Sequence, residues 1–558
     1  MANAGNWVPV VAIPCGLLVA VAIWKYWLRR QENVFILCAK WLVAPPVFSL
    51  VFVWVLGGEP IDNVMVGCVV GFTTIHLLQA FDHYFDPRRP KPTSMAGHDI
   101  LKESEGVAWI ESDRELFNTC KAKIGRIPIP AAAEPMGFLF SGSPGSGKTQ
   151  AFIQLANSAR ERSQPAVVAD LGAEYLSMFY RETKDIIYNP FDQRSVDWSP
   201  FAEMGSAVDA IALTWSMVPE GTGSSKEWHF YSRTILYVVL VRLFKLGKPT
   251  NGALCYYLLT APLPELAELC KGSVAAPYFE LGNERMLGSV RAILCTYLQP
   301  YMHLNPDVGS DGYSIKKFVR SKADSWMFLT YREDQLKALR PLLAAQLDIA
   351  SSALLSSGTN LNNRLWFFLD EAYALGFVDS MVSLVSLGRK KGGCPVLGLQ
   401  SITQLGEVYG NEKTETILNC LKNTLMLYQS SNKNEDHMIN LLGERKFLEV
   451  TPSKTSTFAG GTVSRSTSMT SQIKTEKALI KGELRDLDPL EGILKLDGRM
   501  PPTRICIPIA TNQQDVTPFL DVKEGQSIDI AKPTMDLPEQ PSTVPSTYLK
   551  SKSGYSDL

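Results

Sequence analysis

The sequence predicts an α/β fold with an all-helical insertion and an apolar N-terminal region. Fully apolar runs, typical of buried strands, occur before and after residues 209–305. Within 209–305 the apolar residues follow a helical period, and the alternation of β-branched residues disappears. Three apolar stretches of about bilayer length lie within the first 85 residues. Because 558 residues exceed the usual size of one domain, we expect a membrane part and two or more soluble lobes.

The N-terminal residues 1–87 are predicted to form a transmembrane anchor. Trp7–Trp24 and Trp41–Leu56 carry no charge, and Val64–Phe81 contains only His76 as a titratable group. Basic residues follow the first and third stretches, whereas the loop between the second and third is acidic, so the body is expected in the cytoplasm. A three-span anchor and a two-span hairpin with one interfacial stretch both stay open.

The net charge and the cysteine content bear on whether the chain binds nucleic acid, zinc or neither. The formal net charge of −1 gives no global positive field, so any DNA contact has to come from a local patch or a pore lining. The 10 cysteines form no CxxC pair and no Cys/His cluster with zinc spacing. We therefore expect reduced, structural thiols, as in other cytoplasmic proteins.

A complete GxxxxGKT pattern follows the first buried strand of the body. The apolar run Met136–Phe140 precedes it and a helix-like segment follows it, which predicts a loop whose backbone N–H groups hold the phosphates of ATP. Lys148 would neutralise the β and γ oxygens, and Thr149 would bind Mg²⁺. The predicted nucleotide-binding residues are Gly142, Ser143, Pro144, Gly145, Ser146, Gly147, Lys148 and Thr149.

A second apolar run, Leu365–Leu369, ends in two acids and predicts a strand that neighbours the strand of the phosphate-binding loop. Asp370 would hold Mg²⁺, and Glu371 would act as the general base that polarises the attacking water. Two solvated acids at a strand end are the structural alternative. The interval between Thr149 and Asp370 is longer than two or three βα units need, so the helical lobe is interpreted as an insertion between the nucleotide motifs.

Three further polar residues end or flank strands. The run Pro395–Leu399, expected beside the acid strand, ends in Gln400, which is predicted to sense the γ-phosphate, with an ordinary polar strand end as the alternative. The run Ala166–Ala169 ends in Asp170, which is assigned either a structural role or a supporting role behind the metal ligand. Arg389 lies in a cationic loop and is a candidate arginine finger for an adjacent subunit's site, with a solvated surface arginine as the alternative.

Taken in order, these motifs resemble the type IV coupling proteins, the TraD/TrwB-like ATPases of conjugation and type IV secretion, over nearly the whole chain. The matching segments are SGSPGSGKT, DIIYNPFDQRSVDWSPFAE, SWMFLTYREDQLKALRPLLAAQLD, FFLDEAYALG, GRKKGGCPVLGLQSITQLGEVYG and NCLKNTLML. One departure follows the second strand, where Asp170-Leu171-Gly172-Ala173-Glu174 lacks the lysine that relatives commonly carry.

The resemblance implies a RecA-like motor with an all-α domain, assembled as a homo-hexamer at the bacterial inner membrane, multi-pass, with its bulk in the cytoplasm. It implies ATP and Mg²⁺ as cofactors and places Lys148 and Thr149 on the phosphate and magnesium positions. It likewise places Asp370 and Glu371 on the metal and water positions, Gln400 on the sensor and Arg389 on the trans-acting finger. The implied partners are DNA, relaxase/relaxosome or effector proteins, and the inner-membrane components of a secretion channel.

The implied function is an ATPase that couples nucleoprotein or protein substrates to that channel. An ATP-gated membrane receptor that never pumps DNA, and a DNA translocase of the FtsK/HerA-like group, stay open as alternatives. The expected domains are the anchor (1–87), the two parts of the RecA-like domain (88–208 and 306–514), the all-α domain (209–305) and a disordered tail (515–558).

Overall fold

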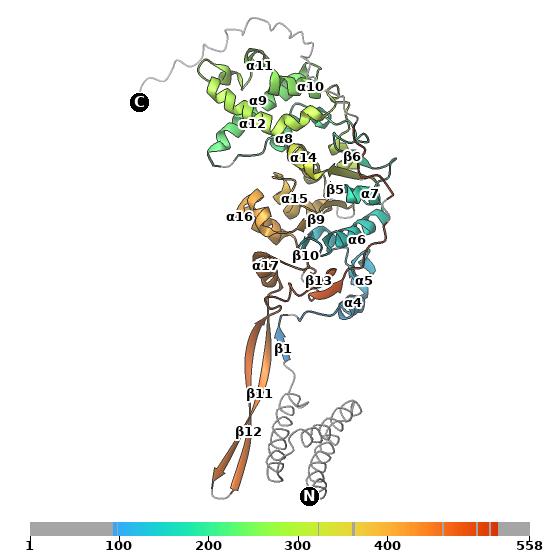
Figure 1. Cartoon of the computed structure of the whole chain (residues 1–558), viewed down its shortest axis with the longest axis vertical. Helices are drawn as coiled ribbons and strands as arrows, with labels where there is room; N and C mark the ends of the chain where they lie inside the picture. The colour runs from blue at the N-terminus through green and yellow to red at the C-terminus, as the bar shows by residue number, and fades with distance from the viewer. Residues whose placement is uncertain are drawn as a thin grey trace, which may run out of the picture. The chain divides into compact units, whose positions relative to one another are not determined.

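The computed structural model describes residues 93–522, with short gaps at 98, 222, 322, 360–362, 460–461, 498–499 and 513–514 (Figure 1). The predicted membrane stretches therefore lie outside the described residues. The chain divides into two units, which we describe separately. The body comprises Ala96–Arg445 and the residues from Thr475 on, and the other unit contains Lys446–Lys474.

The body is built on a nine-stranded sheet with the strand order β14-β13-β10-β4-β9-β8-β5-β7-β6. All neighbouring pairs from β10 to β6 are parallel, whereas β13 is antiparallel to β10 and β14 is antiparallel to β13, so the sheet is mixed. The strands are β4 (Phe138–Ser141), β5 (Ala166–Leu171), β6 (Ile186–Tyr188), β7 (Trp326–Tyr331), β8 (Leu365–Leu369), β9 (Gly393–Leu399), β10 (Asn423–Met426), β13 (Glu491–Lys495) and β14 (Thr503–Cys506).

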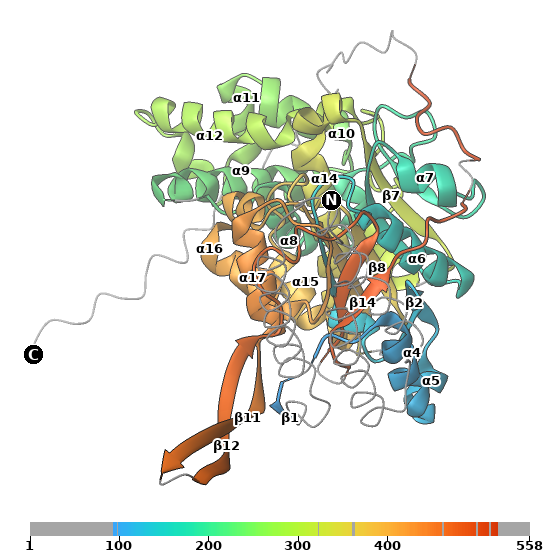
Figure 2. The ribbon, with the colours of Figure 1, turned by 60° about the horizontal axis from the view of Figure 1, so that its bottom comes forward.

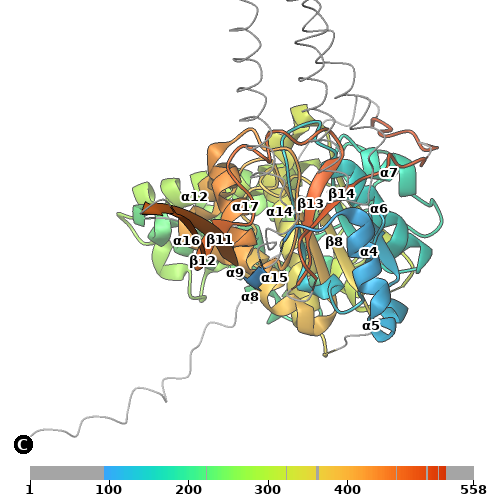
Figure 3. The same ribbon diagram turned by 90° about the horizontal axis from the view of Figure 1, so that it is seen from below.

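Helices cover both faces of this sheet, and alternate strand residues point to opposite faces. On β4, Phe138 and Phe140 belong to the core under α6 and α7, whereas Leu139 belongs to the core under α14, α15 and α16. Figure 3 shows α4 and α6 on one side of the strands and α15 and α16 on the other. Burial on both faces explains why the strands read as continuous apolar runs. These helices are α4 (Glu103–Ser112), α6 (Lys148–Glu161), α7 (Glu174–Phe179), α14 (Glu333–Leu355), α15 (Met381–Leu387) and α16 (Ile402–Cys420).

The interval predicted to be all-helical contains no strand among its described residues. Its main helices lie together, and α8 and α12 pack against α14 at the sheet (Figures 1 and 2). They are α8 (Asp209–Met217), α9 (Lys226–Lys245), α10 (Asn251–Cys255), α11 (Leu263–Cys270) and α12 (Glu284–Leu298). The predicted domain boundaries at 208 and 305 stay predictions.

The remaining α-helices and strands of the body are short. They are α5 (Arg114–Thr119), β2 (Ala122–Ile124), β3 (Ile127–Ile129), α13 (Ile315–Ser321) and α17 (Asn432–Leu442). Within the described part of the chain, α14 alone has the length and hydropathy of a membrane span, and most of it is buried inside the body.

A three-stranded sheet of order β1-β11-β12 is separate from the main sheet. It consists of β1 (Thr93–Ala96) and the long hairpin of β11 (Glu444–Ala459) and β12 (Thr462–Lys477). The Ser/Thr-rich composition around residues 451–471 predicts a hairpin or a loop, and the hairpin is the form observed.

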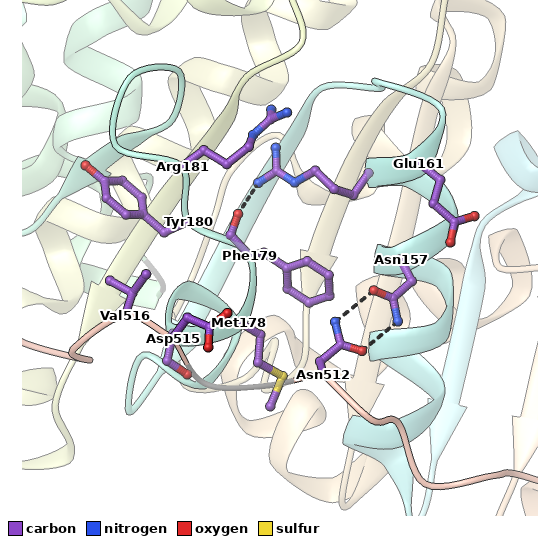
Figure 4. A pocket seen from close by; sticks show the side chains of 11 residues that line it. Asn157, Glu161, Met178, Phe179, Tyr180, Arg181, Asn512, Asp515 and Val516 are labelled. Atoms are coloured by element: carbon purple, nitrogen blue, oxygen red, sulfur yellow. Dashed lines mark hydrogen bonds between the residues drawn. The ribbon is translucent and has the colours of Figure 1, made fainter.

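The expected disordered tail from residue 515 stays a prediction, and the described residues up to Val522 contact the body. Asn512 exchanges side-chain hydrogen bonds of 2.9 Å with Asn157 of α6 (Figure 4). Further on, the backbone N–H of Asp515 donates to Ser177 O (3.1 Å) and Arg194 Nη1 donates to Thr517 O (2.8 Å). Val516 and Phe519 also pack against the core, although the segment has no apolar period in the sequence. Residues 523–558 lie outside the described part of the chain.

A buried ion triad ties the start of the body to its sheet. Glu134 is 1% exposed, and its carboxylate contacts Arg162 Nη1 at 2.6 Å and Arg364 Nε at 3.2 Å. We expect Glu134→Ala to lower the free energy of unfolding by about 3–5 kcal/mol, because it leaves two largely buried guanidinium groups without their acid. Urea denaturation of the purified chain measures the loss. The matched control is Glu161→Ala, at an exposed position, and equal shifts for both variants would contradict the prediction.

Candidate active site

The predicted phosphate-binding loop connects β4 to α6 and borders a cavity of about 450 Å³. Two of its glycines adopt positive φ, 75° at Gly145 and 104° at Gly147, a region that favours glycine. A Cβ atom at Gly147 would also lie 2.8 Å from Leu490 Cδ2. The loop conformation therefore needs the glycines that the sequence pattern supplies.

This cavity brings together most of the predicted site residues. All predicted loop residues except Gly142 and Ser146 line it, together with Asp370, Glu371 and Gln400. Arg389 is not part of the lining. The loop follows β4, the acid pair follows β8 and Gln400 follows β9, so the cavity lies where parallel strands present their carboxyl ends, the usual ligand-binding edge of such sheets.

Lys148 is held at the centre of the loop. Its Nζ donates a hydrogen bond of 2.9 Å to the carbonyl oxygen of Gly142, and the residue is only 8% exposed. Burial lowers the pKa of Lys148, and the negative charges of Asp370 and Glu371 oppose that shift. The cavity therefore contains a cation faced by two acids.

Asp370 forms the link between the loop and the acid strand. Its Oδ2 accepts hydrogen bonds from Thr149 Oγ1 (3.2 Å) and from Tyr175 OH (2.8 Å). Burial raises the pKa of this carboxyl, while the bond from Tyr175 and the charge of Lys148 act in the opposite direction. On the adjacent strand a Cβ at Gly398 would lie 2.0 Å from Asp370 O, so glycine is required for the two strands to approach.

Glu371 lies beside Gln400, whose Nε2 donates to Glu371 Oε1 at 2.9 Å. Burial and the charge of Asp370 raise the pKa of Glu371. The expectation that the acid strand neighbours the loop strand is wrong, because β9 lies between β4 and β8. The inserted strand places Gln400 between the phosphate-binding loop and the acids.

Tyr175 is a site residue that the sequence analysis missed. Asp170 accepts the backbone N–H groups of Tyr175 (3.2 Å) and Leu176 (2.7 Å), and this fixes the first turn of α7. These bonds give Asp170 a structural role, one of the two roles predicted for it, and burial raises its pKa to about 7. The turn aims the Tyr175 hydroxyl at Asp370. No spacing rule marks this tyrosine, so only its place after the second strand could have drawn attention to it.

The donor set fits a magnesium ion that is held mainly by phosphate oxygens. Asp370 Oδ1 is buried and has no hydrogen-bond partner among the described residues. The Thr149 hydroxyl donates to the other oxygen of the same carboxylate, Oδ2. No cluster of three or more metal-ligating side chains occurs in the described ranges. One carboxylate and one hydroxyl suit Mg²⁺, which is commonly bound by one or two carboxylates together with substrate phosphates.

Arg389 lies away from the cavity of its own chain. It is exposed, in the short turn Gly388–Lys391 that precedes β9, and its Nη1 is 3.0 Å from Met136 Sδ. The amino end of β9 is the opposite edge of the sheet from the phosphate-binding loop. Arg389 therefore does not reach this site within one chain, and its role in a neighbour's site stays a prediction.

The sheet, the glycine loop with its lysine, and the acid pair define a P-loop nucleotide-binding protein with a RecA-like α/β fold. Residues 121–508 match the family described as the type IV secretion-system coupling protein DNA-binding domain, and the chain belongs to this family. The predicted family is thus confirmed.

Known relatives agree with this assignment. Coupling protein TraD of Escherichia coli (strain K12) is 25% identical over 403 residues, which are 71% of this chain and 56% of TraD, so the match spans little more than half of that relative. The conjugative coupling protein TrwB in its unbound form is 28% identical with a TM-score of 0.68, over 76% of this chain and 96% of that structure. TrwB in complex with ADP and Mg²⁺ is 28% identical with a TM-score of 0.67, over 77% and 98%. TrwB has also been solved with the ATP analogue ADPNP, so the predicted cofactors agree with those of this relative.

Proposed function

We propose that this chain is a membrane-anchored ATPase that couples DNA, with attached protein, to a type IV secretion or conjugation channel. The observation that carries the proposal is the meeting of Lys148, Asp370 and Glu371 around one cavity beside a P-loop. The family's description as a DNA-binding domain supports DNA as the substrate. The apolar stretches within residues 1–87 support the anchor, and their flanking charges support a body in the cytoplasm.

Each residue around the cavity has a role that follows from its contacts. Backbone N–H groups of the loop and Lys148 would hold the phosphates of ATP, and Thr149 with Asp370 would hold Mg²⁺, which neutralises charge that develops on the phosphoryl oxygens. Glu371 would take a proton from the attacking water, and a carboxylate with a raised pKa is the stronger base. Gln400, bound to Glu371, would transmit the loss of the γ-phosphate to β9 and α16.

Assembly into a homo-hexamer is part of the proposal. Arg389 is exposed at the edge of the sheet opposite the cavity, so an arginine finger at this position would act on the site of an adjacent subunit. Relaxase or effector proteins and the membrane components of the channel are the proposed protein partners.

The test is ATP hydrolysis by the purified full-length chain in detergent micelles. We expect the rate per subunit to increase with protein concentration, because subunits complete each other's sites, and to increase further when DNA is added. A rate that no DNA changes would contradict DNA pumping. The same result, combined with retention of relaxase or effector proteins, would support the ATP-gated receptor instead.

A further inference from the structure

The active-site cavity has a second, apolar side. In the sheet order, β9 and β8 with Gln400 and the acids lie on one side of β4, whereas β10 and β13 lie on the other. Pro489 and Leu490 immediately precede β13, and both line the cavity together with Ile509. The cavity thus spans from charged groups on one side of the P-loop to three apolar side chains on the other.

Leu490 is fixed against the P-loop by its backbone. Its N–H donates to the carbonyl oxygen of Ser146 at 3.0 Å, and its own carbonyl oxygen accepts from the N–H of Ile507 at 2.8 Å. Leu490 has a φ of 70°, a left-handed conformation that is strained for leucine. Such strain persists where the surroundings hold a residue in place, and it is found often at ligand sites.

Ile509 is fixed to the P-loop helix from both sides. The N–H of Ala510 donates to Gln150 Oε1 at 2.7 Å, and Gln154 Nε2 donates to the carbonyl oxygen of Pro508 at 3.2 Å. Both glutamines belong to α6. Despite this anchoring, the Ile509 side chain is 69% exposed. A large apolar side chain held at the mouth of a nucleotide-sized cavity has surface available for an apolar ligand group.

We propose that Pro489, Leu490 and Ile509 form the wall that receives the purine base of the bound nucleotide, an inference that rests on the proposed nucleotide binding. The phosphates lie toward Lys148 and the acids, so the base of the same molecule extends to the other side of the loop, where these three side chains cover it. None of the three side chains carries a hydrogen-bond donor or acceptor, so the wall binds adenine and guanine by contact area and does not distinguish them.

The test compares nucleotides with a ligand that has phosphates and no base. Calorimetry on the full-length chain in detergent, with Mg²⁺, measures the dissociation constants of ATP, GTP and inorganic tripolyphosphate. We expect Ile509→Ala to weaken ATP and GTP alike by about three- to tenfold, through lost apolar contact. Tripolyphosphate should bind Ile509→Ala as it binds the unmodified chain. The matched control is Ile480→Ala, at another exposed isoleucine away from the cavity.

The outcomes separate this inference from the proposed function. If the unmodified chain binds neither ATP nor tripolyphosphate, the nucleotide site itself is absent. If it binds both and Ile509→Ala leaves ATP unchanged, only the base wall is wrong. An equal loss for ATP and tripolyphosphate would also overturn the base wall, because Ile509 would then act by supporting the P-loop.

Discussion

The Lys148→Ala chain is expected to lose ATP hydrolysis by about a thousandfold or more, because it removes the buried cation that faces the transferred phosphoryl group. In the structure the ammonium group is held by Gly142 O at 2.9 Å and is 8% exposed, so bulk water does not screen it as it would a surface lysine. Release of inorganic phosphate by the full-length chain measures the loss.

Lys123→Ala is the matched control for this variant. Lys123 is an exposed lysine of β2, outside the cavity lining. Its removal should leave hydrolysis unchanged. If Lys148→Ala kept the full rate, the assignment of the cavity as a nucleotide site would be wrong.

Glu371→Gln is expected to reduce hydrolysis by about 10²- to 10⁴-fold, because an amide cannot accept the proton of the attacking water. The replacement has nearly the same shape, and Gln400 can turn its own amide to keep a hydrogen bond to residue 371. ATP should therefore still bind, with an affinity close to that of the unmodified chain. Parallel measurements of phosphate release and of ATP binding test both halves of this expectation.

The pH dependence of ATP hydrolysis by the unmodified chain tests the role of Glu371 independently. A general base works only when deprotonated, so the rate falls as the pH decreases through the pKa of Glu371. Because burial and Asp370 raise that pKa, the fall should occur at a higher pH than an ordinary glutamate would give. For the Glu371→Gln variant, the matched control is Glu407→Gln, at an exposed position of α16. If Glu371→Gln lost ATP binding together with hydrolysis, Glu371 would have a structural role and would not be the general base.

Much of this candidate site is predictable from local sequence patterns. The P-loop is predictable because a tight phosphate cradle needs glycines at fixed positions, as at Gly145 and Gly147. The strands are predictable because a parallel sheet buried on both faces demands unbroken apolar runs, such as Trp326–Tyr331 and Leu365–Leu369. In each case a single short segment contains all the residues on which the prediction depends.

Features that depend on distant segments were missed. The placement of β9 between the loop strand and the acid strand follows from pairing across the sheet, which no single segment encodes. Tyr175 reaches Asp370 only because Asp170 fixes the turn before it. The contacts of residues 515–522 include backbone groups that every sequence has, such as Thr517 O, and an ion pair of Asp521 with the distant Arg332.

The position of β4 in the sheet bears on how the protein is made. Its two neighbours, β9 and β10, come from the second half of the chain, with Phe138 paired to Val396 on one side and to Asn423 on the other. A chain emerging from the ribosome thus exposes its glycine loop long before either supporting strand has been synthesised. Helices α8–α12, by contrast, contact one another over short sequence distances and can fold early. We expect a nascent chain to gain its affinity for ATP only when translation is nearly complete.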